Sequence, residues 1–275
     1  MEIISTTPNA AFQHILMTEG TLRWPSQLAA NTVCFTVDVE WAAQAVVDDI
    51  RSVFDGYDVK ATFFVTHADV AVPGHERGLH PNFRRNGDTY RSLADAGHLT
   101  DEAVNRHIIT ATRAFAPEAK GVRAHCLHSD STLLPLYREL GLEYDSCYHM
   151  PLVEGIRPFW IYGSLVELPI YYGDSLDLSM EMTDFQVARL ALDRPGLKVL
   201  NFHPNTVYIN AGSNAAQAAT RTFYRDPEKL RAARNDGRGV RTLLIETLEY
   251  VRRHDIPTAL LQGVNAAWRT LPKWS

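Results

Sequence analysis

The chain has 275 residues, of which 45% are hydrophobic and 21% are charged, which is typical of a globular protein and excludes the disordered and low-complexity classes. Its 27 Lys and Arg against 32 Asp and Glu give a net charge of -5, so there is no global basic field to attract nucleic acid. We expect no membrane span, because no uninterrupted apolar segment approaches about 18 residues. Residues 1–25 lack the basic start and apolar stretch of a secretion signal, so a cytoplasmic protein is expected.

The cysteines and the local basic cluster carry little functional information. Cys34, Cys126 and Cys147 lie within or beside apolar runs and lack CxxC spacing, which favours reduced thiols in a cytosolic protein. Four arginines at near-helical spacing among alanines are interpreted as a solvated helix face and not as a nucleic-acid site. They are Arg231, Arg234, Arg238 and Arg241.

The first predicted unit is a strand, a helix and a second strand. Residues 31–40 (NTVCFTVDVE) have the pattern of a buried strand, and residues 42–54 have apolar positions at helical spacing. Residues 59–65 (VKATFFV) have the pattern of a second buried strand. This order is typical of a parallel sheet, whose neighbouring strands need crossover connections.

The alternation continues to residue 148. Residues 100–115 begin with a Thr followed by acids, which signals a helix start, and residues 120–127 are predicted as a strand. Residues 131–140, followed by Gly141, predict a helix with its carboxyl-terminal stop. Residues 142–148 are predicted as the next strand.

The remaining chain is less regular until residue 196. Residues 149–177 are rich in Pro, Gly and aromatics and suit a strand or hairpin with a long loop. Residues 196–204 (GLKVLNFHP) predict a buried strand, 241–254 an amphipathic helix and 256–261 a last strand. The alternation and the length favour an α/β fold with one domain, residues 1–275, since single-domain (β/α) barrels commonly have about 250 residues.

Polar residues interrupt the predicted strands near their carboxyl ends. They are Asp38 and Glu40 on one predicted strand face, Arg123 and His125, Asp145, and His203. In a parallel barrel all these ends face one mouth, so the side chains should converge. The two acids could simply be a partly exposed strand end that pairs with surface bases, but imidazoles at other strand ends favour a metal ligand beside a general base.

A further imidazole lies in GHERGLHPNF, residues 74–83. His80 stands between a Leu and a Pro-Asn turn, from which its side chain can project into the mouth. A lone His is more often a packed or surface residue, as we expect for His75. Whether His80 is a candidate site residue therefore depends on the other motifs.

Five segments in this order resemble the motifs of the polysaccharide deacetylase (NodB-homology) superfamily, in the forms of its O-antigen-locus deacetylase-like branch. They are FTVDVEW, VKATFFV, GHERGLHPNF, VRAH and LNFHP, and they span roughly residues 31–205. The resemblance implies an irregular (β/α) barrel of the TIM-barrel-like NodB type. It also implies hydrolysis of N-acetyl groups on sugars with one divalent metal, usually Zn²⁺.

The resemblance implies a role for each matched residue. Asp38 matches the catalytic base, and Arg123 matches the arginine that holds this base in place. Glu40 matches the metal carboxylate, and His80 matches the first histidine of the His-x-x-x-His metal motif. His203 matches the general acid.

The chain departs from the family pattern at the second histidine of that metal motif, where it has Arg84. A hydrolytic zinc site normally has three protein ligands and an open position for water. His125 is the candidate replacement, because it lies two residues after Arg123 and on the same face of a predicted strand. His128 is the reserve candidate, although a surface loop explains it somewhat better.

Candidate substrate contacts are Asn82, Asp174 and Trp160. Asp174, together with Asp177, could hydrogen-bond sugar hydroxyls or orient His203, which is the role of a later acidic motif in the family; an ordinary acidic loop is the alternative. Aromatic residues could stack on a sugar face, but beside apolar neighbours they are more often core. These residues are Trp160, Tyr171 and Tyr172, and Asn205 is a further candidate polar contact.

The expected function is that of a metal-dependent carbohydrate N-deacetylase. Its substrate would be an N-acetylated amino sugar of a surface polysaccharide or its precursor, and its cofactor one divalent metal. Two alternatives stay open. The same barrel could hydrolyse formamides or cyclic amides, and Arg84 in a ligand position is consistent with a non-catalytic carbohydrate-binding relative.

Overall fold

The computed structural model describes residues 25, 28–85, 87–94 and 100–273. The segment on which the expected absence of a secretion signal depends, residues 1–25, lies outside the described residues except for Pro25. None of the helices in the described ranges combines the length and the apolar character needed to cross a bilayer.

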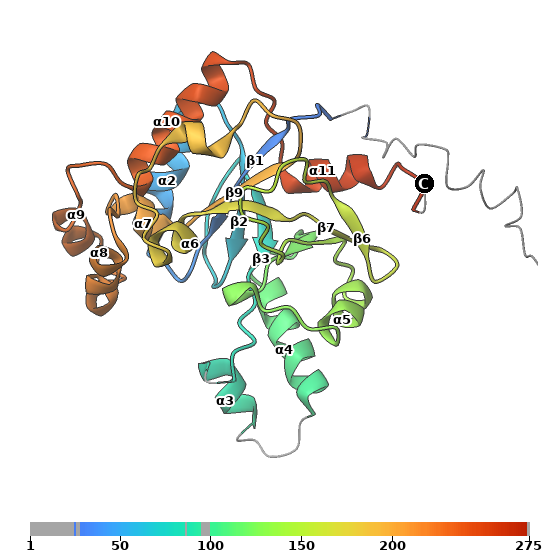
Figure 1. The fold of residues 1–275 in the computed structure, drawn as a ribbon. Coiled ribbons are helices and arrows are strands. Elements are labelled where there is room, and N and C mark those ends of the chain that lie inside the picture. Colours follow the sequence, from blue (N-terminus) through green and yellow to red (C-terminus); the bar gives the residue numbers. More distant parts are fainter. Residues whose placement is uncertain (1–24, 26–27, 86, 95–99, 274–275) are drawn as a thin grey trace, which may run out of the picture.

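Nine described strands form one sheet in the order β6-β7-β5-β4-β3-β2-β1-β9-β8 (Figure 1). Every neighbouring pair is parallel except β6 and β7. The strands are β1 (Val33–Asp38), β2 (Ala61–Val65), β3 (Glu76–Leu79), β4 (Gly121–Val122), β5 (Tyr144–Asp145), β6 (Phe159–Ile161), β7 (Leu165–Glu167), β8 (Ile170–Gly173) and β9 (Lys198–Phe202). The sheet curls and has β6 and β8 at its edges, so the predicted irregular (β/α) barrel is confirmed.

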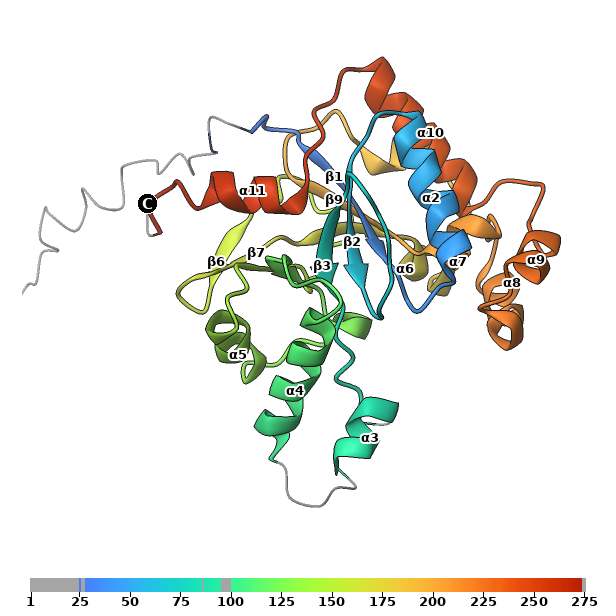
Figure 2. The ribbon, with the colours of Figure 1, turned by 180° about the vertical axis from the view of Figure 1, so that it is seen from behind.

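Helices cover the outside of the curled sheet. Figures 1 and 2 show α2, α7 and α10 on one side of it and α4 and α5 on another. The helices are α2 (Gln44–Gly56), α3 (Asp88–Ala94), α4 (Asp101–Arg113), α5 (Leu133–Glu139), α6 (Asp174–Ser179), α7 (Pro204–Tyr208), α8 (Asn214–Ala219), α9 (Pro227–Ala232), α10 (Val240–Arg253) and α11 (Leu261–Trp268). Short 3-10 turns occupy His125–Leu127, Val187–Leu190 and Arg221–Phe223.

Aromatic packing joins the first predicted unit to the core. Phe54 of α2 lies 5.6 Å from the ring of Phe35 in β1 and 6.3 Å from the ring of Phe63 in β2. All three side chains are completely buried, and burial of each stabilises the fold by roughly 1.5–3 kcal/mol. Strands that are covered on both faces consist of nearly continuous apolar residues, which is why the sequence of residues 31–40 and 59–65 predicts buried strands.

The helix-end signals in the sequence are confirmed. The Thr100 hydroxyl accepts a hydrogen bond from the backbone N of Ala103, at 3.2 Å, at the start of α4, which satisfies one of the free N–H groups of the first turn. Gly141 follows α5 with a φ of +76°. Glycine adopts this left-handed conformation without strain, so it ends the helix as predicted.

Three predicted strands are shorter than expected, and one is wrong. β1 ends at Asp38, β4 covers only Gly121–Val122 and β5 only Tyr144–Asp145. Residues 256–261 form no strand, although Thr258 makes an isolated bridge to Val33. The reason is that β1 already has β2 and β9 as neighbours, which leaves no free edge for another strand.

The segment after Thr258 instead forms α11, which covers the amino ends of β2 and β3. The N–H of Leu261 donates to the Thr62 hydroxyl at 3.2 Å, and that of Gln262 donates to Glu76 at 3.1 Å. Tyr144 also donates to Glu76, at 2.5 Å. This buried polar group closes the end of the barrel opposite the carboxyl ends of the strands.

The arginine cluster does not form one helix face, so that interpretation is wrong. Arg231 lies in α9, whereas Arg241 lies in α10. Two members pair with one carboxylate of α2, because Asp49 accepts from Arg241 and lies 3.6 Å from Arg234. Arg238 pairs with Glu246 at 2.6 Å. The three cysteines form no disulfide.

Candidate active site

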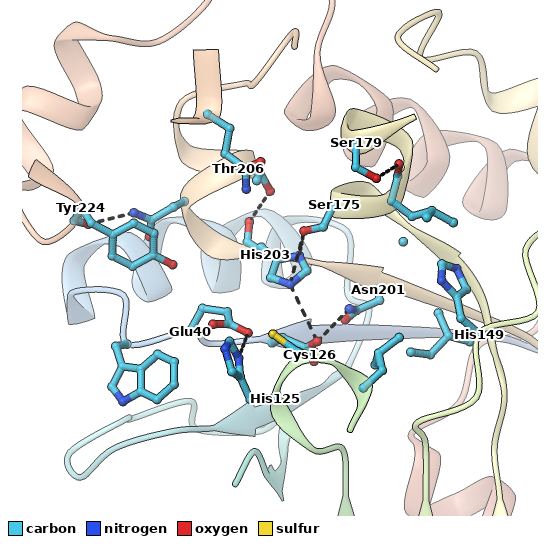
Figure 3. Close-up of a pocket in the computed structure, with 18 residues that line it drawn as sticks. Glu40, His125, Cys126, His149, Ser175, Ser179, Asn201, His203, Thr206 and Tyr224 are labelled. Atoms are coloured by element: carbon cyan, nitrogen blue, oxygen red, sulfur yellow. Dashed lines mark hydrogen bonds and ion pairs between the residues drawn. The ribbon is translucent and has the colours of Figure 1, made fainter. Parts of the chain in front are cut away.

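One cavity of about 640 Å³ lies where β1, β8 and β9 end (Figure 3). Residues from both halves of the chain line it, and five of the predicted site residues or their neighbours are among them. These are Asp38, Glu40, His125, Asn201 and His203. The expected convergence of polar strand ends at one mouth therefore occurs.

Asp38 reaches the cavity as the last residue of β1, whereas Glu40 reaches it by a turn and not by strand alternation. β1 ends at Asp38, and both Glu40 and Trp41 have left-handed backbones, with φ of 50° and 57°. The N–H of Trp41 donates to the Thr66 hydroxyl at 2.9 Å, which ties this turn to the end of β2. The prediction that both acids lie on one strand face is wrong, but both still line the same cavity.

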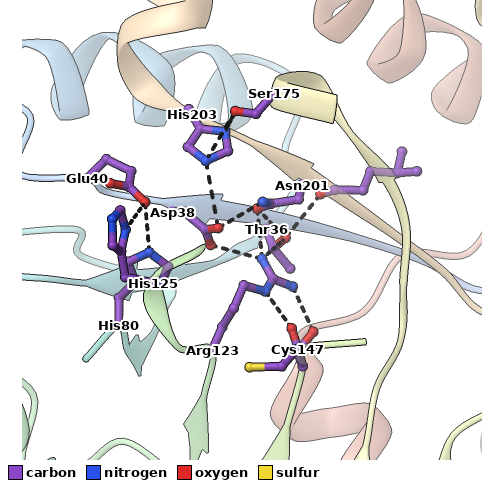
Figure 4. Close-up of polar contacts among 12 residues, drawn as sticks. Thr36, Asp38, Glu40, His80, Arg123, His125, Cys147, Ser175, Asn201 and His203 are labelled. Carbon is purple, nitrogen blue, oxygen red and sulfur yellow. Dashed lines mark hydrogen bonds and ion pairs between the residues drawn. The ribbon is translucent and has the colours of Figure 1, made fainter. Parts of the chain in front are cut away.

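Glu40, His80 and His125 form a compact group. Oε1 of Glu40 lies 2.9 Å from Nε2 of His80 and 2.8 Å from Nδ1 of His125 (Figure 4). One donor atom from each residue lies within 4.8 Å of the other two. Two imidazole nitrogens and one carboxylate oxygen are a common donor set for zinc in hydrolytic sites, so these residues fit a divalent metal.

Short backbone links position the two imidazoles. His80 follows β3 directly, and its N–H donates to the carbonyl of Val65 at 2.9 Å. The N–H of His125 donates to the carbonyl of Pro81 at 2.9 Å, in the 3-10 turn that follows β4. His125 was expected on a strand face. That geometry is wrong, since the strand has ended by residue 122 and a turn presents the ring instead.

Hydrogen bonds between Glu40 and the two imidazoles strongly shift the pKa values of Glu40 and His125. Burial would raise the pKa of Glu40, but hydrogen bonds from His125 and His80 outweigh it and hold the pKa far below its usual range. Burial would lower the pKa of His125, yet hydrogen bonds to Cys126 and Glu40 raise that pKa to about 10. One carboxylate thus accepts two imidazole N–H groups, an arrangement in which a cation can replace the shared protons.

The residues around the family's second histidine position do not join this group. Arg84 is exposed and lines a second cleft together with His128. His128 is also exposed, and its ring contacts Phe83 at 5.9 Å. Asn82 accepts a hydrogen bond from the backbone N of Arg84 at 3.0 Å and does not line the cavity. The structure therefore offers no support for His128 as a ligand or for Asn82 as a substrate contact.

Arg123 is completely buried and organises the second part of the site. Its Nη1 donates to Asp38 at 3.0 Å, to Thr36 at 2.8 Å and to Asn201 at 2.7 Å. Its Nε and Nη2 donate to the carbonyl and hydroxyl of Ser146 at 2.9 and 2.7 Å. All three guanidinium nitrogens are engaged, and the predicted contact with Asp38 is present.

These contacts keep Asp38 ionised. Burial would raise the pKa of Asp38, but the positive charge of Arg123 outweighs it, with help from His80 and His203, so the pKa lies below its ordinary value. Asn201 donates to the second oxygen of Asp38 at 2.9 Å. An ionised and immobilised carboxylate at the edge of a cavity has the properties of a general base.

His203 lies beside Asp38 and is held by Asp174. Nε2 of His203 is 3.8 Å from Asp38, and Nδ1 is 2.5 Å from Oδ1 of Asp174. Ser175 Oγ lies 3.0 Å from the same Nδ1. Burial would lower the pKa of His203, but Asp174 outweighs it and raises the pKa to about 9. The imidazole is therefore charged at neutral pH and able to donate a proton.

Asp174 is completely buried, and both its oxygens are occupied. It accepts from the N–H groups of His203 and Ser175, at 2.8 and 2.6 Å, and from the hydroxyl of Thr206. Of the two roles considered for Asp174, the structure agrees with orientation of His203 and leaves no oxygen free for a sugar. Asp177 pairs with Arg189 and does not line the cavity.

The aromatic candidates do not line the cavity either. Trp160 lies on edge strand β6, beneath the cationic groups of Arg269 and Lys273 at 5.5 and 5.2 Å. Tyr171 and Tyr172 are buried, and the Tyr171 hydroxyl donates to the carbonyl of Leu190 at 2.9 Å. The expectation that Trp160 contacts substrate in this cavity is therefore wrong, because the residue lies on edge strand β6 and does not line the cavity.

Several cavity residues escaped the sequence analysis. Asn201 could have been found, since a buried strand that carries a polar residue two positions before His203 places both on one face. Ser175, His149 and Tyr224 also line the cavity. Nothing in the local pattern marks them. Asp145, the remaining acid at a predicted strand end, is buried beside Glu167 in β7 and lies outside the cavity.

Comparisons with known proteins show what the chain is similar to. A crystal structure from Bordetella bronchiseptica, of a protein assigned to the polysaccharide deacetylases and to O-antigen biosynthesis, is 28% identical with a TM-score of 0.69. The similarity covers 80% of this chain and 91% of that one. A polysaccharide deacetylase structure from Mycobacterium smegmatis is 19% identical with a TM-score of 0.54, over 90% and 93% of the two chains, and shows the fold alone.

Among curated proteins, none matches the sequence. The family model described as WbmS-like polysaccharide deacetylase matches residues 35–221, which is about two thirds of the 275 residues. The matched segment contains every residue of the two polar groups described above. The chain therefore belongs to the WbmS-like polysaccharide deacetylase family.

Proposed function

We propose that the protein is a divalent-metal-dependent hydrolase that removes the N-acetyl group from an amino sugar of a surface polysaccharide or its precursor. The observation that carries this proposal is the convergence of Glu40, His80 and His125 within 4.8 Å, beside an acid and an imidazole that face the same cavity. Family membership supports a carbohydrate substrate. The assignment of the Bordetella protein supports a role in O-antigen synthesis, and a cytoplasmic location stays a prediction.

Glu40, His80 and His125 would hold the metal. A bound Zn²⁺ would polarise the acyl oxygen and lower the pKa of a nearby water from about 15.7 toward 7. His80 is almost completely buried, whereas Glu40 and His125 line the cavity. The donor set is therefore closed on the protein side and open toward substrate, as a catalytic metal site requires.

The other site residues move protons. Asp38 takes a proton from the attacking water, and Arg123 and Asn201 keep its two oxygens ionised and oriented. His203 then gives the proton on Nε2 to the sugar nitrogen, since an unprotonated amine is a poor leaving group. Asp174 holds Nδ1 of His203, which directs the donating nitrogen toward the cavity.

The test combines metal analysis with product analysis. We expect the purified protein to retain or bind one zinc ion and to release acetate from at least one member of a panel of N-acetylated amino sugars and their oligomers. Asp38→Asn should lower the rate by about 10²-fold or more while zinc remains bound. Formate release instead of acetate would select a formamide substrate. Sugar binding without metal, unchanged in Asp38→Asn, would contradict the proposal and favour a carbohydrate-binding protein.

A further inference from the structure

The cavity contains a phenol that the mechanism above does not use. Tyr224 follows the turn Arg221–Phe223 and lines the cavity. Figure 3 shows its ring on the same side of the cavity as Glu40, with the hydroxyl directed toward the space between Glu40 and His203. No hydrogen bond from this hydroxyl to a described residue is present, so it can donate to a ligand.

Two hydrogen bonds hold this segment against the site. The side chain of Asn205 in α7 donates to the carbonyl of Tyr224 at 2.8 Å. Nε of Arg225 donates to the carbonyl of Trp41 at 3.1 Å. The ring of Trp41 in turn contacts the ring of His125, with centroids 5.2 Å apart. Tyr224 is thus linked to the helix after His203 and to the turn that carries Glu40.

The surroundings of Tyr224 keep its phenol neutral. Burial is the main cause that raises the pKa of Tyr224 above its ordinary value. A neutral phenol has one O–H to donate. A donor that is already positioned, and that is excluded from most of the solvent, stabilises a developing negative charge more strongly than water does.

Two donors that line the cavity near Asp38 are committed to other residues of the site. Asn201 donates to Asp38 at 2.9 Å, and Ser175 Oγ lies 3.0 Å from Nδ1 of His203. Arg123 is completely buried and lies outside the cavity wall. Tyr224, by contrast, is an uncommitted donor, and its hydroxyl faces both Glu40 of the metal group and His203.

We propose that Tyr224 is a catalytic residue whose hydroxyl donates a hydrogen bond to the acyl oxygen as that oxygen becomes negatively charged. This role rests on the proposed hydrolysis. The water oxygen bonds to the acyl carbon while Asp38 takes its proton, and the carbonyl electron pair moves to the acyl oxygen. The C–N bond then breaks as His203 protonates the nitrogen. Tyr224 keeps its proton throughout and is unchanged at the end.

The role can be separated from that of His203 by the leaving group. Both p-nitrophenyl acetate and an N-acetyl sugar pass through a negatively charged acyl oxygen, but p-nitrophenolate leaves without being protonated. With zinc-loaded protein we expect Tyr224→Phe to lower kcat by about 10²-fold on both substrates, with KM within about threefold. His203→Gln should impair hydrolysis of the sugar amide far more than hydrolysis of the ester.

Tyr250→Phe is the matched control, since it also removes a phenol hydroxyl and Tyr250 is a half-buried residue of α10 that does not line the cavity. It should change kcat by less than about twofold. Zinc content and the thermal unfolding midpoint are measured for each variant to exclude misfolding. If correctly folded Tyr224→Phe keeps kcat within twofold of wild type on both substrates, the proposed role is wrong.

A binding measurement provides a readout independent of turnover. Methylphosphonate carries tetrahedral anionic oxygens, and its affinity for the zinc-loaded protein is measured by calorimetry. We expect Tyr224→Phe to weaken this affinity by about tenfold and Tyr250→Phe to leave it unchanged. Zinc-loaded wild type that cleaves neither substrate would overturn the proposed hydrolysis. Weakened methylphosphonate binding in Tyr224→Phe would even then support its hydrogen-bond donation, and unchanged binding would overturn it.

Discussion

Replacement of Asp174 by Asn should shift the pH range in which the enzyme is active. Asp174 is completely buried and is the main group that raises the pKa of His203 from 6.5 to about 9. Asn has the same size but no charge, so the imidazole pKa should return to about 6.5 or below. In the proposed mechanism His203 must be protonated to act as an acid, so we expect activity to be lost as pH rises through this pKa.

The size of the effect follows from the fraction of protonated imidazole. At pH 7.5 a group with a pKa of about 9 is almost fully protonated, whereas a group at 6.5 is only about one-tenth protonated. Hydrolysis of an N-acetyl sugar at pH 7.5 should therefore fall by roughly tenfold from this cause alone. The loss should be smaller at pH 6, where wild type and variant are both largely protonated.

The assay is a pH profile of kcat/KM for acetate release by zinc-loaded protein between pH 5.5 and 10. The alkaline limb should move from near pH 9 in wild type to near pH 6.5 in Asp174→Asn. With p-nitrophenyl acetate, whose leaving group needs no proton, the variant should lose little activity. An alkaline limb at the same pH in both proteins would refute the assignment of His203 as the acid held by Asp174.

Stability provides a second check on the same pair. His203 has a raised pKa in the folded state, so the Asp174 interaction contributes fully below the unfolded value of 6.5 and is lost as pH rises through about 9. The Asp174→Asn variant would also leave one buried donor facing another, which costs roughly 1–3 kcal/mol at all these pH values. The difference in unfolding midpoint between wild type and variant should therefore shrink from pH 6 to pH 10.

Three further changes test the metal group, a buried acid and a close contact. Glu40→Gln should weaken zinc binding by at least about 100-fold, measured by competition with a chelator, because the variant lacks the anionic ligand. Glu167→Gln should become more stable relative to wild type as pH rises from 5 to 8, by about 1 kcal/mol in chemical denaturation. The reason is that burial and the neighbouring Asp145 raise the pKa of Glu167, so wild type must either hold a proton or bury a charge. Gly121→Ala should lower the free energy of unfolding by roughly 2 kcal/mol or more, since its methyl would lie 1.8 Å from the Tyr144 ring.

Each of these changes has a control or a contradicting result. Glu228→Gln, at an exposed position of α9, should leave zinc affinity unchanged. A Glu167→Gln variant whose stability relative to wild type does not depend on pH would show that this carboxyl ionises normally. Gly263→Ala in α11, where a methyl meets no atom within 4 Å, should be neutral or slightly stabilising. Equal losses from the two alanine changes would exclude the proposed contact with Tyr144.

Much of the site was predictable because it consists of polar residues that end apolar strands. Asp38, Arg123 and His203 each end or follow a strand whose carboxyl end faces the mouth of the barrel. Their convergence follows from the parallel order of the sheet. His125 was also chosen correctly as the imidazole near Glu40, although for the wrong reason, since a turn and not a strand face presents it.

The incorrect predictions share a different cause. Trp160 was assigned to substrate from its residue type, but it lies on an edge strand away from the cavity. Tyr224 was not considered, although it lines the cavity, because it belongs to a short irregular segment with no apolar period. The strand expected over residues 256–261 failed because β1 already has two neighbours, a fact about the whole sheet.

The linear order of apolar runs and strand-ending polar residues was thus enough to indicate the class of fold and most of the polar residues that meet at the mouth of the barrel. Alternation and periodicity are local properties, and they encode which residues face the interior of a parallel sheet. The turn conformation at Glu40 and the approach of Tyr224 to the site were decided only by the tertiary structure. The pairing of Asp174 with His203 was one of the roles considered for Asp174, and the structure decided in its favour. It joins residues 29 positions apart, and no local pattern records which distant segments will meet.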